Sequence, residues 1–335
     1  TCRHHWKGTE DVPSTAKSIL TLTVNPAIDA TYELQELMPG QTHRVPPANE
    51  RAGGKGINVA RVLHTQGVPC FAIATAGGAG GHALRQDLDR SGLRHHIIPV
   101  AAETRRSIAF VDCTTRLTSI FNETGSPLLE QEWNDIRHAV RGALARQGES
   151  RSGVLVASGS LPPAAPAGFY AEIVALCHAH DVPAVIDATG QQLIDSAKAG
   201  ADLVKPNHHE LMETLGDSDL PSAARKLLSL GAKAVLVSAG AAGMYGFTSA
   251  DPEFHWRARL PRPFAGNPTG AGDAAVAAAA LAFNAGTPDI RAVLQAATAW
   301  GSAAVLMPFA GEISPRHREI ANELEITREK DAPCL

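Results

Sequence analysis

A single carboxylate beside a turn of small residues is the feature of this chain that most clearly suggests chemistry. Residues 267–275 read Asn-Pro-Thr-Gly-Ala-Gly-Asp-Ala-Ala, and the alanine-rich run that follows predicts a helix that begins at this turn. The first N–H groups of a helix have no partner within it, so the amides of Gly270, Ala271 and Gly272 are predicted to attract an anion. Asp273 is suited to take a proton from an attacking hydroxyl during phosphoryl transfer. Its alternative role is to complement the helix dipole.

Two familiar nucleotide-binding motifs are excluded. Gly270, Gly272 and Ala275 fit the dinucleotide pattern G-x-G-x-x-G/A, but that pattern should follow a strand early in a βαβ unit. The preceding residues, RARLPRPFAGNP, contain three prolines and predict no buried parallel strand, which disfavours an NAD-dependent oxidoreductase. The Walker pattern is absent because Lys55 is followed by Gly56. If the chain is a kinase, it is therefore not of the P-loop type.

A second glycine cluster, AGGKGINVA, occurs near the N-terminus. Gly53 and Gly54 would let the backbone approach a ligand closely. Lys55 supplies a point charge suited to phosphate, and Asn58, at the start of a predicted helix, can bond to hydroxyls. A plain helix-entry loop is the alternative interpretation of this segment.

Composition narrows the class of protein. The chain has 335 residues, 44% hydrophobic and 19% charged, enough for one large α/β domain or two smaller ones. A net charge of −4 argues against a nucleic-acid partner, and no apolar run approaches the roughly twenty residues that cross a bilayer. The five cysteines, odd in number and without C-x-x-C spacing, fit a reducing, cytoplasmic location. Residues 1–18 and 328–335 are predicted to be a flexible extension and a flexible tail.

Strand-like and helix-like segments alternate along the chain, which predicts a mainly parallel sheet with helices on both faces. The predicted strands are 19–24, 71–75, 153–157, 184–187, 202–205 and 234–237. The predicted helices are 56–66, 82–91 (opened by a glycine-rich turn, GGAGG), 129–146, 166–180, 221–230, 271–285 and 289–305. In such sheets, ligands bind at the carboxyl ends of the strands.

Two segments, 29–50 and 104–122, break this alternation. Both read as short polar strands with turns, and 107–112 and 118–122 form a predicted hairpin. Together they could form a small sheet over one edge of the main sheet. A lid at that place would exclude water from a phosphoryl group in transit.

The segments AGGKGINVARVLHTQG and NPTGAGDAAVAAAAL resemble the paired signature of the PfkB (ribokinase-like) carbohydrate kinases. LTVNPAID, SGSLPP, LVKPNHHEL and VLVSAGAAG are similar to segments at the same places in the branch that phosphorylates hexose phosphates. The resemblance extends from about Ile19 to Leu324. It implies a ribokinase-like three-layer α/β/α sandwich over residues 19–327, with a small β lid. The chain departs from the branch at Ser107, where many relatives have Asn, and at Ala164, where they have Gly.

Carried over residue by residue, the resemblance implies that Asp273 is the catalytic base and that the amides of Gly270, Ala271 and Gly272 form the anion hole. It assigns to the sugar phosphate the residues Asp29, Gly53, Gly54, Lys55, Asn58 and Arg105, with Arg105 receiving the existing phosphate. It assigns Asn207 and Glu210 to Mg²⁺, and Ser238, Gly240 and Gly243 to the nucleotide. The residues themselves leave simpler roles open: a strand-end turn for Asp29, a solvated charge for Arg105 and a helix cap for the Asn207 and Glu210 pair.

The implied activity is ATP-dependent phosphorylation of a hexose phosphate to a bisphosphate, with ATP and Mg²⁺ as cofactors. It is most like that of 1-phosphofructokinase or tagatose-6-phosphate kinase. The alternatives are a 6-phosphofructokinase, a kinase of an unphosphorylated sugar or nucleoside, and a non-catalytic sugar-binding protein on the same fold. In relatives such lids often pair across a two-fold axis, so a homodimer is expected.

Overall fold

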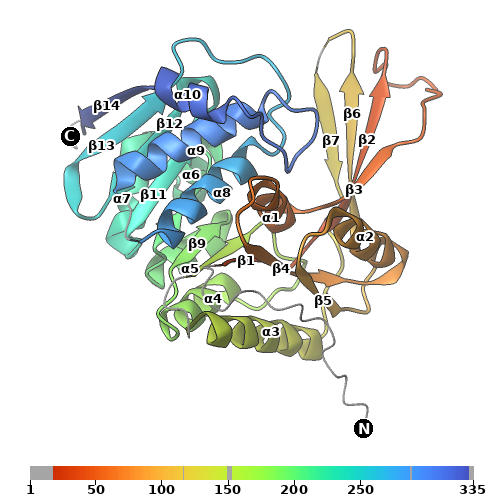
Figure 1. The fold of residues 1–335 in the computed structure, drawn as a ribbon, viewed down its shortest axis with the longest axis horizontal. Coiled ribbons are helices and arrows are strands. Elements are labelled where there is room, and N and C mark those ends of the chain that lie inside the picture. The colour runs from red at the N-terminus through yellow and green to blue at the C-terminus, as the bar shows by residue number, and fades with distance from the viewer. Residues whose placement is uncertain (1–17, 116, 149–152, 287–288, 332–335) are drawn as a thin grey trace.

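The computed structural model describes residues 18–115, 117–148, 153–286 and 289–331. Within these residues a ten-stranded sheet lies between two layers of helices, and a four-stranded sheet projects from one side (Figure 1). The α/β sandwich and the small β lid expected from the sequence are both confirmed. Apart from Ser18, the predicted N-terminal extension lies outside the described residues, as do residues 332–335 of the predicted tail.

The centre of the large sheet is parallel and deeply buried. In spatial order its parallel strands are β5 (His95–Pro99), β4 (Cys70–Ala76), β1 (Ile19–Thr23), β8 (Val154–Ser158), β9 (Ala184–Asp187), β10 (Leu203–Val204) and β11 (Ala234–Ser238). Strands β1, β8 and β9 are buried along their whole length. Burial along the whole strand is what a sheet covered on both faces produces.

Three antiparallel strands extend this sheet beyond β11, and the sequence analysis predicted none of them. They are β12 (Met244–Thr248), β13 (Asp251–Arg259) and β14 (Glu325–Lys330). Residues 328–330, expected in a flexible tail, instead belong to β14 and pair with β13. Asp331, just beyond β14, accepts hydrogen bonds from Arg225 Nε and His255 Nδ1, each at 2.6 Å. These ion pairs attach the end of β14 to the body of the protein.

Each face of the large sheet has its own hydrophobic cluster. One face is covered by α1 (Lys55–Thr65), α2 (Gly78–Ser91), α8 (Ala271–Asn284), α9 (Ile290–Ala304) and α10 (His317–Glu323). The other is covered by α3 (Glu130–Gly148), α4 (Phe169–His178), α5 (Gly190–Lys198), α6 (His208–Leu215) and α7 (Leu220–Leu230). Helix α2 begins at Gly78 and not at residue 82, because all of GGAGG except its first glycine, the N-cap Gly77, belongs to the helix.

The lid sheet has the strand order β3 (Asn49–Gly53), β2 (Ala27–Leu34), β6 (Arg105–Asp112) and β7 (Thr118–Asn122). Strands β2 and β6 pair in parallel, and this register places Asp29 opposite Ser107. In Figure 1 the lid stands apart from the sandwich, beside α1 and α2. Among the helices formed by the described residues, none combines the length and the apolar character that a membrane span requires.

Ala164 is held in a conformation that favours glycine. Its φ is 58°, in the left-handed region where a Cβ costs about 1–2 kcal/mol. We therefore expect Ala164→Gly to raise Tm by about 1 to 2 °C, because the greater freedom of glycine in the unfolded chain offsets part of the gain. Calorimetry of the purified variant measures this shift.

Ala167 provides the matched control for this substitution. It is exposed in the same loop, and its φ is not positive. Ala167→Gly should leave Tm unchanged or lower it. Equal losses in Tm for the two variants would show that Ala164 is not strained.

Candidate active site

The polar residues of the site gather at the carboxyl ends of the parallel strands. Ser158, Asp187 and Ser238 are the last residues of β8, β9 and β11, and Lys205 directly follows β10. Open α/β sheets bind ligands at this edge. The strands themselves are buried, so the side chains at their carboxyl ends are the first that a ligand can reach.

Asp273 lies in the first turn of α8 and is only 7% exposed. Asn58, from the first turns of α1, donates a hydrogen bond from Nδ2 to Asp273 Oδ2 at 2.9 Å. Burial raises the pKa of Asp273 to about 7, although the charge of Lys55 and the Asn58 hydrogen bond act in the opposite direction. A carboxylate with such a pKa can accept a proton near neutral pH. The structure therefore brings together Asn58 and Lys55, predicted to bind substrate, and Asp273, the predicted base.

Asp187 is a second buried carboxylate that the sequence analysis did not single out. Its oxygens lie 3.3 Å from Lys55 Nζ and 3.7 Å from Lys205 Nζ. Ser158 Oγ donates to it at 3.0 Å. Burial opposes its ionisation, but the charges of Lys205 and Lys55 hold the pKa of Asp187 below its usual value. The signal that could have found Asp187 and Lys205 is their position directly at the ends of apolar strands.

The small-residue turn before Asp273 was expected to offer the amides of Gly270, Ala271 and Gly272, and the structure differs from this expectation at one of them. The Ala271 N–H donates to the Pro268 carbonyl at 3.1 Å, so this amide is already engaged. Within the described residues the amides of Gly272 and Asp273 have no hydrogen-bond acceptor. Lys205 Nζ lies 3.6 Å from the position that a Cβ on Gly272 would occupy. A cation and two unpaired amides thus adjoin the Asp273 carboxylate.

Gly270 allows a second loop to approach this turn. Its φ is 83°, and a Cβ there would lie 2.7 Å from Ala310 Cα. A side chain at this position is excluded both by conformation and by space. The segment around Ala310 is therefore packed directly against the start of α8.

The lid contributes the predicted sugar-binding residues. A Cβ on Gly53 of β3 would overlap the carboxylate of Asp29 on β2, so glycine is required there. Burial raises the pKa of Asp29 to about 6, and the charges of Arg105, Arg51 and Arg61 counteract part of this rise. Asp29 and Arg105 therefore interact electrostatically.

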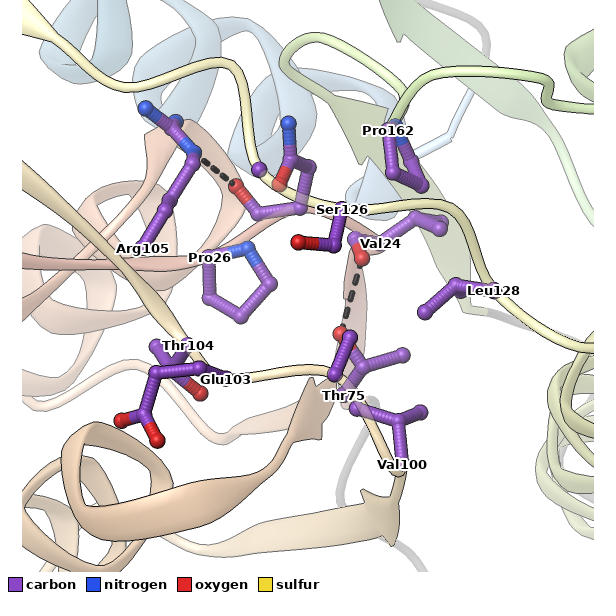
Figure 2. A pocket seen from close by; sticks show the side chains of 13 residues that line it. Val24, Pro26, Thr75, Val100, Glu103, Thr104, Arg105, Ser126, Leu128 and Pro162 are labelled. Carbon is purple, nitrogen blue, oxygen red and sulfur yellow. Dashed lines mark hydrogen bonds between the residues drawn. The ribbon is translucent and has the colours of Figure 1, made fainter.

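Two backbone carbonyls hold the Arg105 guanidinium. Nε donates to the Asn25 carbonyl at 3.2 Å and Nη1 donates to the Glu123 carbonyl at 2.9 Å. Arg105 also lines a small pocket between β6 and the loop that follows β1 (Figure 2). Its neighbour Arg106 forms an ion pair with Glu50 instead and lies on the opposite face of the lid sheet.

The predicted metal and nucleotide residues form a separate group. Asn207 and Glu210 make a capping box at the start of α6, with hydrogen bonds of 2.9 Å in both directions. Ser238 forms a bridge with Asn207, and the turn η1 (Gly240–Ala242) follows it, ended by Gly243 at a φ of 95°. No hydrogen bond joins this turn to Asp273 in the described part of the chain. The charge of Glu210 nevertheless acts on Lys55 and helps to raise its pKa, after the larger effect of Asp187.

The sandwich, its lid and the buried carboxylate at a helix start together define a ribokinase-like protein. A family model described as pfkB family carbohydrate kinase matches residues 20–316. The chain belongs to this family, as its motifs indicated.

The named relatives include a 6-phosphofructokinase and a 1-phosphofructokinase. The chain is 33% identical over 296 residues to ATP-dependent 6-phosphofructokinase isozyme 2 of Mycobacterium tuberculosis, covering 87% of this chain and 84% of the relative. It is 32% identical over 307 residues to 1-phosphofructokinase of Xanthomonas campestris pv. campestris, covering 88% and 93%. The crystal structure of phosphofructokinase-2 from Escherichia coli in complex with fructose-6-phosphate superposes with a TM-score of 0.81, at 27% identity and coverage of 91% and 98%.

Because the folded pKa of Asp273 is raised, its ionisation destabilises the native state. The folded protein binds this proton more tightly than the unfolded chain, so the stability present at low pH is lost as pH rises through about 7. Asp273→Asn removes this loss. We expect its Tm relative to the parent to be higher at pH 8 than at pH 5 by about 3 °C.

Thermal unfolding of the two proteins at both pH values measures this difference. Asn58→Ala is the second variant, because it leaves the Asp273 carboxylate in place without its hydrogen-bond donor. The Tm of Asn58→Ala relative to the parent should be lower at pH 8 than at pH 5. A Tm difference between Asp273→Asn and the parent that is independent of pH would contradict the raised pKa.

Proposed function

We propose that this protein is an ATP-dependent kinase that phosphorylates a hexose phosphate to give a hexose bisphosphate and ADP. The observation that carries the proposal is the environment of the Asp273 carboxylate. This carboxylate is buried, its pKa is about 7, and it is adjacent to unpaired amides and to Lys205. The names of the relatives from Mycobacterium tuberculosis and Xanthomonas campestris support the substrate class.

In the proposed reaction, a hydroxyl oxygen of the sugar attacks the terminal phosphorus of ATP. The bond between this phosphorus and the oxygen that leaves with ADP breaks at the same time. Asp273 accepts the hydroxyl proton. The amides of Gly272 and Asp273, with the ammonium group of Lys205, stabilise the negative charge on the transferred group. Asp29 accepts hydrogen bonds from the sugar hydroxyls, and Arg105 binds the phosphate already present. Gly53, Gly54 and Lys55 complete the proposed sugar site, and Ser238, Gly240 and Gly243 the nucleotide site.

Asn207 and Glu210 fit the magnesium role that the family implies. Their capping box uses Asn207 Oδ1 and Glu210 Oε2, which leaves Glu210 Oε1 without a hydrogen-bond partner among the described residues. No group of three acidic, histidine or cysteine side chains in the described part of the chain could form a metal cage. Magnesium keeps several waters and phosphate oxygens as ligands, so one carboxylate suffices. When bound, the ion would neutralise charge on the nucleotide phosphates.

We also propose that the protein is cytoplasmic. Cys70, Cys113 and Cys177 are free thiols, which supports a reducing compartment.

The experiment that tests the function is an ADP-release assay with fructose 1-phosphate, tagatose 6-phosphate, fructose 6-phosphate and free sugars. We expect turnover of at least one sugar phosphate and a loss of kcat of about a hundredfold or more in Asp273→Asn. Arg105→Ala should raise KM for that sugar phosphate by about ten- to a hundredfold and leave KM for ATP nearly unchanged, because a charge-assisted hydrogen bond contributes about 1.5–3 kcal/mol.

Lys55→Ala, Arg44→Ala and Arg106→Ala are the matched variants for phosphate recognition, because all three are cationic residues in or next to the lid; Arg44 lies in the segment between β2 and β3. Arg106 is the closest comparison, since it is the next residue of β6 but lies on the other face of the sheet. If one of these variants raises KM and Arg105→Ala does not, the phosphate is bound elsewhere. If free sugars turn over best, the substrate is not phosphorylated, and if nothing turns over the protein is a binding protein on this fold.

We also propose a homodimer that forms through the lid. Tyr32, Ile108, Phe110 and Phe121 share the face of the lid sheet opposite to Asp29. Phe110 stacks on Tyr32 at 5.5 Å and contacts Phe121 edge-on at 5.6 Å, yet Phe121 is 59% exposed. An apolar sheet face of this kind is suited to bind a second copy.

Light scattering at micromolar concentration should give twice the chain mass of 35.1 kDa. Phe121→Asp should convert the dimer to a monomer, because a desolvated charge opposes association. Leu129→Asp is the control, since Leu129 is also an exposed large hydrophobic residue but precedes α3, outside the lid. A parent protein that is monomeric, or a dimer that Phe121→Asp leaves intact, would refute this interface.

A further inference from the structure

The glycine-rich turn GGAGG at the start of α2 has no role in the reaction described above. It is occupied by a carboxylate of the chain itself. Glu103 accepts hydrogen bonds from the amides of Gly80 at 2.6 Å and Ala79 at 3.2 Å. A Cβ on Gly78 would overlap this carboxylate, so glycine is required for the approach. A negative charge at this end of a 14-residue helix also interacts favourably with the helix dipole.

Thr104 makes a second attachment to the same turn. Its N–H donates to the Gly77 carbonyl at 3.0 Å, and its Oγ1 accepts from the Gly77 N–H at 3.1 Å. Thr104 is buried, and a Cβ on Gly77 would overlap the carbonyl of Ala102. Three consecutive residues, 102–104, therefore pack against the first turn of α2.

The residue that follows is Arg105, the first residue of lid strand β6. Figure 2 shows the Glu103 side chain directed toward α2 and the Arg105 side chain directed away from it, toward the loop after β1. Farther back, the Ala101 N–H donates to Glu132 Oε1 at 2.6 Å. The chain is thus fixed on α2 and α3 immediately before it enters the lid.

We propose that Glu103 is a positioning residue for phosphate recognition. By attaching the start of β6 to the amides of α2, it holds the Arg105 backbone where the guanidinium reaches both its carbonyl partners and the substrate phosphate. This inference rests on the proposed function, because it concerns the arginine that binds the existing phosphate. In this proposal the glycine-rich turn binds the Glu103 carboxylate, and this contact fixes the position at which β6 begins.

The test compares KM for the sugar phosphate, KM for ATP and kcat in Glu103→Ala and Glu103→Gln. Glu103→Ala should raise KM for the sugar phosphate about three- to tenfold, the size of effect of a lost capping carboxylate, with KM for ATP and kcat little changed. Glu103→Gln keeps a carbonyl acceptor and should restore part of the loss. In an Arg105→Ala background Glu103→Ala should add nothing, because the group that it positions is absent.

Asp219→Ala is the matched control. Asp219 caps α7 by accepting from the Ser222 N–H at 2.9 Å, so its removal weakens a helix start away from the lid. It should leave KM for the sugar phosphate unchanged. An equal rise in KM in this control, or a Glu103→Ala effect that persists without Arg105, would overturn the positioning role.

The two hypotheses fail in different ways. If Arg105→Ala raises KM and Glu103→Ala does not, the positioning role is wrong and the proposed function stands. If Arg105→Ala leaves KM unchanged, the proposed phosphate role of Arg105 is wrong, and the inference about Glu103 falls with it.

Discussion

The site depends on one buried negative charge, the carboxylate of Asp187, which is 1% exposed. An unpaired carboxylate at such depth would be strongly destabilising, so its two cations are obligatory. Lys55 is the first residue of α1, just after the lid strand β3, and Lys205 directly follows β10. The ion pair therefore ties the lid-bearing segment to the centre of the sheet. With Asp187 ionised, the two lysines leave one net positive charge beside the start of α8, where the proposed phosphoryl transfer takes place.

Asp273 lies close to Asp187, but its pKa changes in the opposite direction. Burial dominates its environment and raises its pKa to about 7, whereas the two lysines keep the pKa of Asp187 below its usual value. Each ionised carboxylate disfavours the ionisation of the other, so the one with closer cations stays charged and the other becomes able to exchange a proton. Two aspartates of the same type thus acquire different roles, one as a fixed counter-ion and one as the proposed base. Lys55 is shared between them and acts on both.

The sequence predicted those parts that local patterns determine. The strand-like patterns of β1, β8 and β9 and the alanine-rich α8 predicted the sandwich. The family resemblance assigned Asn58 to the sugar and Asp273 to catalysis, but the hydrogen bond between these two side chains came only from the structure. Strands β12 to β14 were missed because they are short or polar, and β14 is held by Asp331 pairing with residues far away in the chain. Asp187 was missed for a similar reason: a charged residue after a strand is usually solvated, and only the tertiary fold supplies the two lysines. The engagement of the Ala271 amide depends on the Pro268 carbonyl and no composition rule would reveal it.

The lid shows why register, more than composition, determines a binding face. A slip of one residue between β2 and β6 would move Arg105, which now shares a face of the lid sheet with Asp29, to the face that carries the aromatic side chains. Carboxylates attach β6 at both ends. At its start Glu103 binds the amides of α2, and at its end Asp112 accepts from the N–H groups of Leu37, Thr114 and Thr115 at 2.8 to 2.9 Å. Backbone hydrogen bonds hold Asp112 in its charged form and lower its pKa, that of Leu37 having the largest effect. Strand β6 is therefore held in one register by its pairing with β2 and β7 and by two carboxylates bound to backbone amides near its ends, and the face on which Arg105 lies follows from that register.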